Sequence, residues 1–324
     1  MIKGLIFFLI NSIIVLVIAS KSYSIGKKFN FLDYPAKGKI HTSPIPFVGG
    51  VIIYILLIIC FSLNFFINID LNLYSFFYMT VFFVLGFIDD KFDLNSYYKI
   101  LLVIVISLLM IFVDESFLIY KISFEITNNE FYFGLLKIPV TILCILLLYI
   151  AINMSDGINC LLISFASLTL ILINTLVFRH SLEFIDITLL SSLITLLYFN
   201  YKNKVFLGNA GANLIAAYFI YSLINGNYYR SVGVFLVISP FLILGIDMVR
   251  LIFLRLLKRT NPFNRDLNHF HHILYRKFNI KITIATYLII SFMPLTLNYL
   301  TNVTTLAFIP FQILIYSFII YRLR

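Results

Sequence analysis

The stretch LYSFFYMTVFFVLGFIDDKFDLN, residues 73–95, decides the fold class. It carries no charge from residue 73 to residue 88 and then places two aspartates side by side. An uncharged apolar run of this kind is close to what a helix needs to cross a hydrocarbon core of about 30 Å. We therefore interpret it as a membrane span that ends at Asp89 and Asp90.

The rest of the chain repeats this pattern. Of its 324 residues, 61% are hydrophobic and only 12% are charged, whereas soluble domains are about a quarter charged. No polar stretch is long enough for a second domain. Further spans are predicted near residues 2–20, 47–66, 98–116, 136–153, 158–178, 184–201, 207–225, 231–254, 281–299 and 303–320. The sequence thus predicts an all-α polytopic membrane protein of about 11 transmembrane helices, in a single membrane domain over residues 1–324.

The basic residues indicate the orientation in the membrane. When the loops are assigned to alternate sides, 19 of the 24 Lys and Arg residues fall on one side, which the positive-inside rule makes cytoplasmic. The amino terminus is then outside and the carboxyl terminus cytoplasmic. The net charge of +10 does not indicate nucleic acid, because the basic residues lie in short loops. We interpret residues 117–135 as an external hairpin or, as an alternative, an irregular loop, with a structural role.

The paired aspartates are the first candidate for chemistry. Neighbouring carboxylates repel, so Asp89 and Asp90 need a cation, which Lys91 or a divalent metal could supply. The alternative is a solvated helix end, but an aspartate at the carboxyl end of a helix opposes the helix dipole.

A second candidate is the turn NMSDGIN, residues 153–159, between two predicted spans. So short a loop places Asp156 near the hydrocarbon boundary, where an unpaired carboxylate is costly. Metal or substrate would satisfy it, and Gly157 permits close backbone approach to a ligand. The alternative is a hydrophilic connector between helices.

The two candidates above are polar breaks, by which we mean short polar segments between predicted spans. Three more polar breaks fall on the same predicted side. The small residues of FLGNAGAN (206–213) favour close helix packing or, as an alternative, an anion at a helix start. The histidines of NPFNRDLNHFHH (261–272) suit phosphate, metal or proton transfer. In KGKIHTSPIPFVGG (37–50), Lys39 and His41 offer cationic contacts. Convergence of five breaks on one side predicts a single site for an anionic substrate.

In this order, the five breaks resemble those of the polyprenyl-phosphate N-acetylhexosamine-1-phosphate transferases. This is glycosyltransferase family 4, which includes phospho-N-acetylmuramoyl-pentapeptide transferase and undecaprenyl-phosphate GlcNAc-1-phosphate transferase. The resemblance covers nearly the whole chain, and the His-x-His-His pattern of residues 269–272 is similar to that of the simple N-acetylhexosamine branch.

The resemblance implies a reaction in which undecaprenyl phosphate attacks the sugar-side phosphorus of a UDP-N-acetylhexosamine and releases UMP. It implies Mg²⁺, with Mn²⁺ as an alternative, to neutralise the crowded negative charge. It places the protein in the bacterial inner membrane, with the site facing the cytoplasm, at the first membrane step of cell-wall or O-antigen synthesis. It leaves a homodimer open and implies no nucleic acid.

The resemblance also implies roles for individual residues. The catalytic set is Asp89, Asp90, Asp156, His269, His271 and His272. The substrate-binding set is Lys39, His41, Asn153, Gly157, Ile158, Asn159, Asn200 and Phe206, and the metal set is Asp90, Asp156 and Asn209.

Two residues depart from the family pattern. Asn159 and Asn209 stand where the family has aspartate, and neutral amides bring no charge to a metal. An alternative hypothesis is therefore a catalytically weakened relative that binds nucleotide-sugar or lipid carrier. A transporter is a further alternative, in which an acid such as Asp247 would act near the middle of the bilayer.

Overall fold

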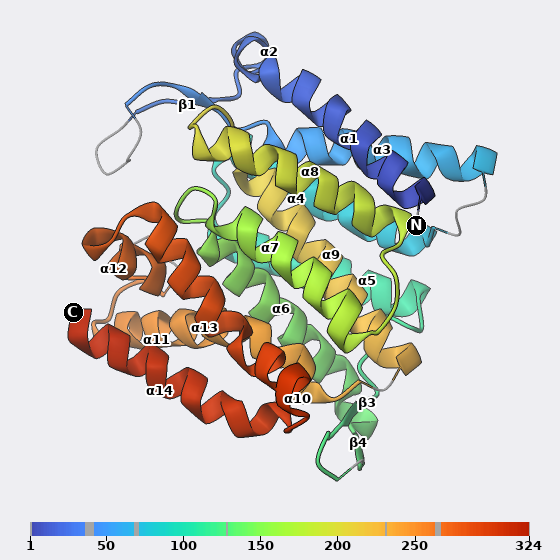
Figure 1. The fold of residues 1–324 in the computed structure, drawn as a ribbon, viewed down its shortest axis with the longest axis vertical. Helices are drawn as coiled ribbons and strands as arrows, with labels where there is room; N and C mark the ends of the chain where they lie inside the picture. Colours follow the sequence, from blue (N-terminus) through green and yellow to red (C-terminus); the bar gives the residue numbers. More distant parts are fainter. Residues whose placement is uncertain are drawn as a thin grey trace. The chain divides into compact units, whose positions relative to one another are not determined.

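The structure is a computed structural model, and it describes residues 2–35, 42–67, 71–127, 129–230, 232–262 and 267–323. Helices form nearly all of it (Figure 1). They are α1 (Ile2–Ser20), α2 (Ser22–Phe29), α3 (Gly49–Ile67), α4 (Leu73–Phe92), α5 (Ser96–Val113), α6 (Lys137–Ser155), α7 (Leu161–Leu172), α8 (Phe184–Tyr201), α9 (Gly208–Arg230), α10 (Val234–Ile238), α11 (Leu242–Leu257), α12 (Phe270–Lys277), α13 (Ile280–Thr301) and α14 (Thr305–Leu323). The strands are β1 (Leu32–Asp33), β2 (Ile45–Pro46), β3 (Lys121–Ser123) and β4 (Glu130–Tyr132).

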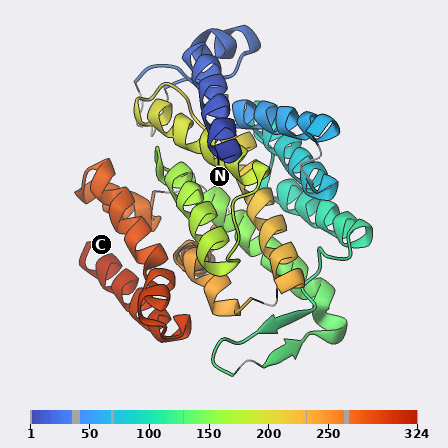
Figure 2. The ribbon, with the colours of Figure 1, turned by 45° about the vertical axis from the view of Figure 1, so that its right-hand side comes forward.

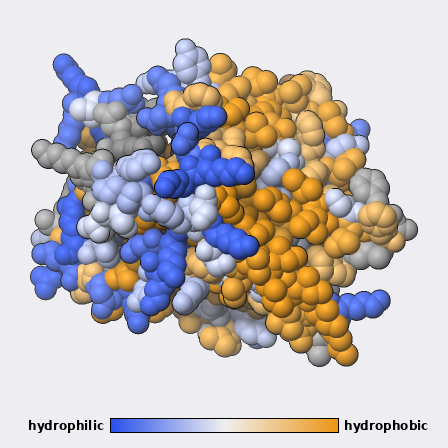
Figure 3. Space-filling model, turned by 90° about the horizontal axis from the view of Figure 1, so that it is seen from above, coloured by the Kyte–Doolittle hydropathy of each residue, from blue (hydrophilic) through white to orange (hydrophobic). Residues whose placement is uncertain are grey.

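The all-α prediction is confirmed, and every predicted span contains helix. Within the described residues, eight helical segments are long and apolar enough to cross a membrane, and two shorter apolar helices accompany them. The protein is therefore a polytopic membrane protein. The number of eleven spans and the orientation stay predictions. Many large apolar side chains of α1, α5 and α14 point outward, and Figure 3 shows broad apolar areas on the surface, as expected where lipid replaces water.

The chain divides into two compact units, which we describe separately. The first unit comprises Met1–Lys99, Leu162–Ile171 and His180–Phe219, and the second comprises Ile100–Leu161, Leu172–Arg179 and Ile220–Arg324.

In the first unit, glycines let the backbones of α3, α4 and α9 come into direct contact. A Cβ atom on Gly50 would lie 2.6 Å from the Cα of Gly211, and one on Gly86 would lie 2.6 Å from the Cα of Ala210. Both distances are far below van der Waals contact, so neither position admits a side chain without backbone movement. The packing interpretation of residues 206–213 is confirmed.

The second unit holds α6 against α11 and α13 against α14, and the last pair lies side by side in Figures 1 and 2. Pro294 lies inside α13 and, lacking an N–H, leaves the carbonyl of Ile290 without its helical donor. The Nε2 atom of Gln312, on α14, donates to that carbonyl at 3.0 Å. The side chain of Gln312 thus replaces the backbone donor that Pro294 lacks.

The hairpin predicted at residues 117–135 is present, as an antiparallel pairing of β3 with β4 (Figure 2). Between its strands, Glu125 accepts hydrogen bonds from the backbone N–H groups of Leu236 at 2.9 Å and Thr305 at 3.0 Å. The turn is thereby attached to the starts of α10 and α14. This supports a structural role for the hairpin.

Candidate functional site

The first group of site residues, which we call the aspartate cluster, consists of Asp89, Asp90, Lys99 and the start of α9, all in the first unit. Helix α4 ends at Phe92, and Asp93 takes a left-handed conformation with φ 48° that turns the chain into the next helix. This turn places the ammonium group of Lys99 3.1 Å from Oδ1 and 3.0 Å from Oδ2 of Asp89.

Asp89 is almost completely buried, and Oδ1 also accepts the backbone N–H of Leu94 at 2.9 Å. The cation predicted beside the aspartates is therefore Lys99. Lys91, the neighbour in sequence, is exposed, and its ammonium lies over the ring of Phe92. Asp89 and Lys99 thus form a largely buried ion pair, and removal of either partner would leave the other without its compensating charge.

Asp90 is bound differently, although it is the next residue. Its Oδ1 accepts the backbone N–H of Asn209 at 2.8 Å and its Oδ2 accepts that of Ala210 at 2.9 Å. The carboxylate therefore caps the start of α9, where the helix dipole favours negative charge. The amides that the sequence offered to an external anion are occupied by Asp90. Gly208, with φ 75°, has no room for a Cβ beside Asp90.

Two further predicted residues form hydrogen bonds with backbone groups: Asn200, at the end of α8, and Phe206, in the loop before α9. The side-chain amide of Asn200 donates to the carbonyl of Val205 at 2.8 Å. The N–H of Phe206 donates to Pro46, and its carbonyl accepts from Gly49. Lys39 and His41 lie outside the described residues.

The second group, which we call the histidine cluster, consists of residues 153–159 with His269, His271 and His272, all in the second unit. At the end of α6 the side chain of Asn153 donates to the carbonyl of Tyr149 at 2.9 Å. Asp156 and Gly157 are exposed, Ile158 is buried and Asn159 is half-buried. The predicted turn therefore has an exposed aspartate and an exposed glycine on the surface of this unit.

Gly157 joins this turn to the histidines. A Cβ atom on Gly157 would lie 2.8 Å from Nε2 of His272 and closer still to Nε2 of His271. Two breaks that are far apart in the sequence therefore meet at one glycine, as the sequence predicted.

The three imidazoles lie close together. The ring centroids of His271 and His272 are 4.3 Å apart, and those of His269 and His271 are 5.4 Å apart with nearly parallel planes. Burial, and then the neighbouring imidazoles, lower the pKa of His271 well below its usual value. Within the described residues, the buried Nε2 of His271 has no hydrogen-bond partner. His271 is therefore neutral at pH 7.

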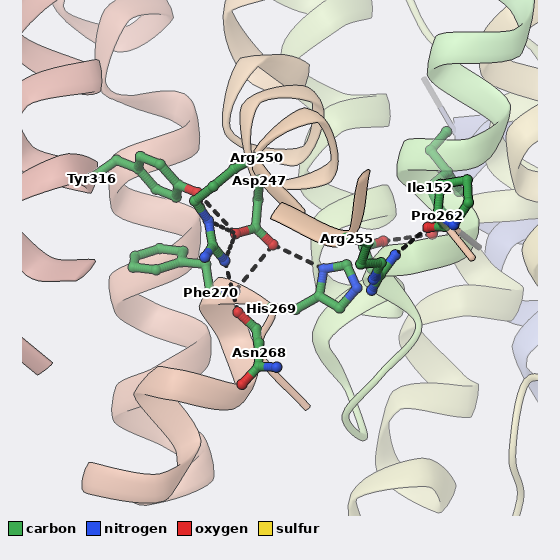
Figure 4. Close-up of polar contacts among 10 residues, drawn as sticks. Ile152, Asp247, Arg250, Arg255, Pro262, Asn268, His269, Phe270 and Tyr316 are labelled. Carbon is green, nitrogen blue, oxygen red and sulfur yellow. Dashed lines mark hydrogen bonds and ion pairs between the residues drawn. The ribbon is translucent and has the colours of Figure 1, made fainter. Parts of the chain in front are cut away.

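Asp247, on α11, is hydrogen-bonded to the first histidine (Figure 4). Its Oδ2 lies 2.9 Å from Nδ1 of His269 and accepts the backbone N–H of Phe270 at 3.1 Å. Its Oδ1 accepts from Nη2 of Arg250 at 2.7 Å and from the hydroxyl of Tyr316 at 2.8 Å. This acid is fully engaged by a cation and hydrogen bonds, unlike the proton-carrying acid of a transporter.

Comparison with known proteins identifies the family. A profile described as glycosyl transferase family 4 matches residues 72–227. The undecaprenyl-phosphate alpha-N-acetylglucosaminyl 1-phosphate transferase of Thermotoga maritima is 30% identical over 255 residues, which cover 78% of this chain and 75% of that protein. This chain belongs to glycosyl transferase family 4.

Other members of glycosyl transferase family 4 are similar over a comparable length. A probable undecaprenyl-phosphate N-acetylglucosaminyl 1-phosphate transferase of Bacillus subtilis is 25% identical, covering 85% of this chain and 78% of its own. The undecaprenyl-phosphate alpha-N-acetylglucosaminyl 1-phosphate transferase of Escherichia coli K12 is 26% identical, covering 78% and 71%. The family comprises polyprenyl-phosphate N-acetylhexosamine-1-phosphate transferases, multi-pass membrane proteins that generally depend on Mg²⁺.

Within the described residues of this family 4 protein, no three His, Cys, Asp or Glu side chains are grouped to hold a metal. The predicted ligands Asp90 and Asn209 belong to the first unit, and Asp156 belongs to the second. Their oxygens are nevertheless the donors that Mg²⁺ prefers. Such an ion commonly binds one or two carboxylates and takes its other ligands from substrate phosphates and water. Within each unit, these carboxylate and amide oxygens are of the donor type that fits an ion bound together with a diphosphate.

Lys99 and Asp247 are the site residues that sequence reasoning missed. From the sequence, Lys99 is only one of the basic loop residues, and Asp247 is only a candidate acid for a transporter. For Asp247 a signal exists, because an acid and a base three residues apart, as in Asp247 and Arg250, lie on one face of a helix. No local signal points from Asp89 to Lys99, since the turn at Asp93 brings them together.

Proposed function

We propose that this protein transfers N-acetylhexosamine 1-phosphate from a UDP-N-acetylhexosamine to undecaprenyl phosphate at the cytoplasmic face of a bacterial inner membrane. An oxygen of the lipid phosphate attacks the sugar-side phosphorus. The bond from that phosphorus to the bridging oxygen breaks, and UMP leaves. One phosphoanhydride replaces another, and the product is the first membrane intermediate of a cell-surface glycan.

The observation that carries this proposal is the contact of Gly157 with the imidazoles of His271 and His272. It joins the exposed residue Asp156, beside Gly157, to a group of nitrogen donors. Phosphate oxygens are bound by such donors, and a carboxylate beside them suits the metal that accompanies a diphosphate. The histidine cluster therefore suits the diphosphate of the nucleotide-sugar.

The aspartate cluster suits the acceptor phosphate. The Lys99 ammonium neutralises Asp89, so a phosphate beside the pair meets a nearly neutral group rather than a bare carboxylate. Asp89 can then orient the attacking oxygen, and Asp90 fixes the start of α9 behind it. In this proposal both clusters act on the same reaction.

Magnesium supplies charge neutralisation at the diphosphate when it is bound. The resemblance to the family assigns Asp90, Asp156 and Asn209 as its ligands. The substrate-binding set that the resemblance implies stays unchanged: Lys39, His41, Asn153, Gly157, Ile158, Asn159, Asn200 and Phe206.

The test is UMP release by the detergent-solubilised protein supplied with undecaprenyl phosphate. UDP-GlcNAc and UDP-GalNAc are offered in turn, with Mg²⁺, with Mn²⁺ and with chelator. We expect UMP from at least one donor, and only with a divalent ion. No UMP from either donor contradicts the proposal.

A second candidate function rests on Asn159 and Asn209. If these neutral amides weaken the metal site, the protein is a relative that binds nucleotide-sugar or lipid carrier with little turnover. The double variant Asn159→Asp with Asn209→Asp then gains UMP release over a wild type near zero. Brisk wild-type turnover that the double variant does not raise rejects this candidate.

A further inference from the structure

The carboxylate of Asp247 is the meeting point of three segments of the second unit. Asp247 is almost completely buried on α11. Tyr316 reaches it from α14, Arg250 from the next turn of α11, and His269 from the segment before α12 (Figure 4). Arg250 also donates from Nη2 to the carbonyl of Asn268 at 2.7 Å. The acid and its arginine therefore both hold the chain beside His269.

The contact with His269 fixes which ring nitrogen carries the proton. An ionised carboxylate only accepts hydrogen bonds, and Arg250 keeps Asp247 ionised by direct contact at Oδ1. Nδ1 of His269, 2.9 Å from Oδ2, must then be the protonated nitrogen. The other ring nitrogen, Nε2, then accepts a hydrogen bond when the ring is neutral, and it donates to a phosphate oxygen when the ring is protonated.

The same oxygen also fixes the start of α12. Oδ2 accepts the N–H of Phe270, the first residue of that helix. His271 and His272 follow in its first turn and pack against Gly157. A shift of the Phe270 amide therefore moves both imidazoles relative to the turn that contains Asp156.

We propose that Asp247 is the positioning residue of the histidine cluster, where it sets the tautomer of His269 and the register of His271 and His272. This rests on the proposed function for its catalytic consequence, but the tautomer and the register belong to the protein alone. Asp247 touches neither substrate nor metal in this role. It acts through the histidines.

The test uses Asp247→Asn, with Asp114→Asn as the matched control. Asp114 is also buried, lies in the same unit and accepts a tyrosine hydroxyl, that of Tyr221, at 2.7 Å. An asparagine at residue 247 keeps the size of the side chain but has one acceptor oxygen, and its NH₂ group faces donors. We expect the kcat of UMP release to fall about 10- to 100-fold, as for other second-layer partners of histidine ligands. The KM for UDP-sugar should change much less, and the Asp114 variant should keep the wild-type kcat.

The tautomer is measured directly by ¹⁵N NMR of protein labelled at its five histidines. The signals of His269 are assigned by their loss in His269→Gln. In wild type we expect the proton of neutral His269 on Nδ1, and in Asp247→Asn a shift of population to Nε2. Tyr316→Phe, which removes a donor only from Oδ1, should leave the wild-type tautomer.

The outcomes separate the two claims. If the wild type shows the expected tautomers but releases no UMP, the proposed function is contradicted and the positioning role is supported. A neutral wild-type His269 with its proton on Nε2 instead of Nδ1 overturns the positioning role, even if Asp247→Asn fails to fold. Unchanged tautomer and unchanged kcat in a folded Asp247→Asn overturn it as well.

Discussion

Replacing Gly157 by alanine tests the contact between the two motifs of the histidine cluster. The added Cβ would lie 2.8 Å from Nε2 of His272, whereas ordinary contact begins near 3.4 Å, so this ring must move by 3.4 − 2.8 = 0.6 Å and His271 by more. His271 is 1% exposed and has no open space to enter. Overpacking of this kind costs about 1–3 kcal/mol of unfolding free energy.

The effect on catalysis should exceed the effect on stability. A misplacement of about 1 Å in a reacting geometry lowers turnover roughly 10²-fold, so we expect Gly157→Ala to reduce the kcat of UMP release about 10- to 100-fold. The assay compares initial rates at saturating UDP-sugar with the thermal midpoint of each variant in the same detergent. Gly245→Ala is the control, because nothing lies within 4 Å of the Cβ it would add.

Removing the imidazole of His271, which the added methyl group overlaps, tests the same contact. His271→Ala added to Gly157→Ala removes the closest overlap, so the thermal midpoint should recover part of its loss while activity stays low. A folded Gly157→Ala variant with wild-type kcat refutes the claim that this glycine is needed for the position of the imidazoles.

Three further predictions concern charge and backbone. Lys99→Met should cost about 3 kcal/mol of unfolding free energy and most of the activity, since removal of one partner leaves the buried Asp89 carboxylate unpaired. Denaturation in mixed micelles measures the loss of stability, and the UMP assay measures the loss of activity. Gly208→Ala should cost about 1–2 kcal/mol because its φ of 75° is left-handed, with a further loss from the clash with Asp90, read as a lower thermal midpoint. His271 has a lowered pKa, so only the unfolded chain takes up its proton just below pH 6.5. The unfolding free energy should therefore fall by up to about 1.4 kcal/mol for each pH unit below pH 6.5. Thermal midpoints measured from pH 7.5 down to pH 5.5 test this.

Each of these has a matched comparison. Lys91→Met removes an exposed lysine next to the same aspartates and should leave stability near wild type; equal losses in both lysine variants contradict the assignment of Lys99. For Gly208, the same Gly245→Ala control applies. An unchanged thermal midpoint in Gly208→Ala contradicts the close contact of Gly208 with the Asp90 carboxylate that caps α9. His271→Phe should flatten the acid branch of the pH profile, and an unaltered slope excludes His271 as its source.

The membrane spans and the histidine cluster were within reach of the sequence for different reasons. Apolar runs indicate their own environment, so helices were predictable from hydropathy in all the expected spans. The polar helices α2 and α12 lie in segments that the sequence indicated as loops, and hydropathy did not predict them. The meeting of Gly157 with His271 followed from family order and from the rule that polar turns on one side of a membrane can converge.

Partners of single side chains could not be predicted in the same way. Lys91 looked like the cation for Asp89 because it is adjacent in sequence, but the left-handed turn at Asp93 places Lys99 there instead. The amides at the start of α9 looked available to an anion, and only the close packing of α4 on α9 shows that Asp90 occupies them. Long-range hydrogen bonds leave no trace in local composition.

The central claim is that the sugar-side phosphorus of the nucleotide-sugar passes to the lipid. It is tested most directly with UDP-N-acetylhexosamine labelled with ³²P at that phosphorus, incubated with the purified protein, undecaprenyl phosphate and Mg²⁺ and then partitioned between butanol and water. We expect the label in the butanol phase, in a lipid diphosphate, while unlabelled UMP stays in water. Label that remains in water, either in intact donor or in UDP formed by cleavage of the sugar bond, contradicts the account.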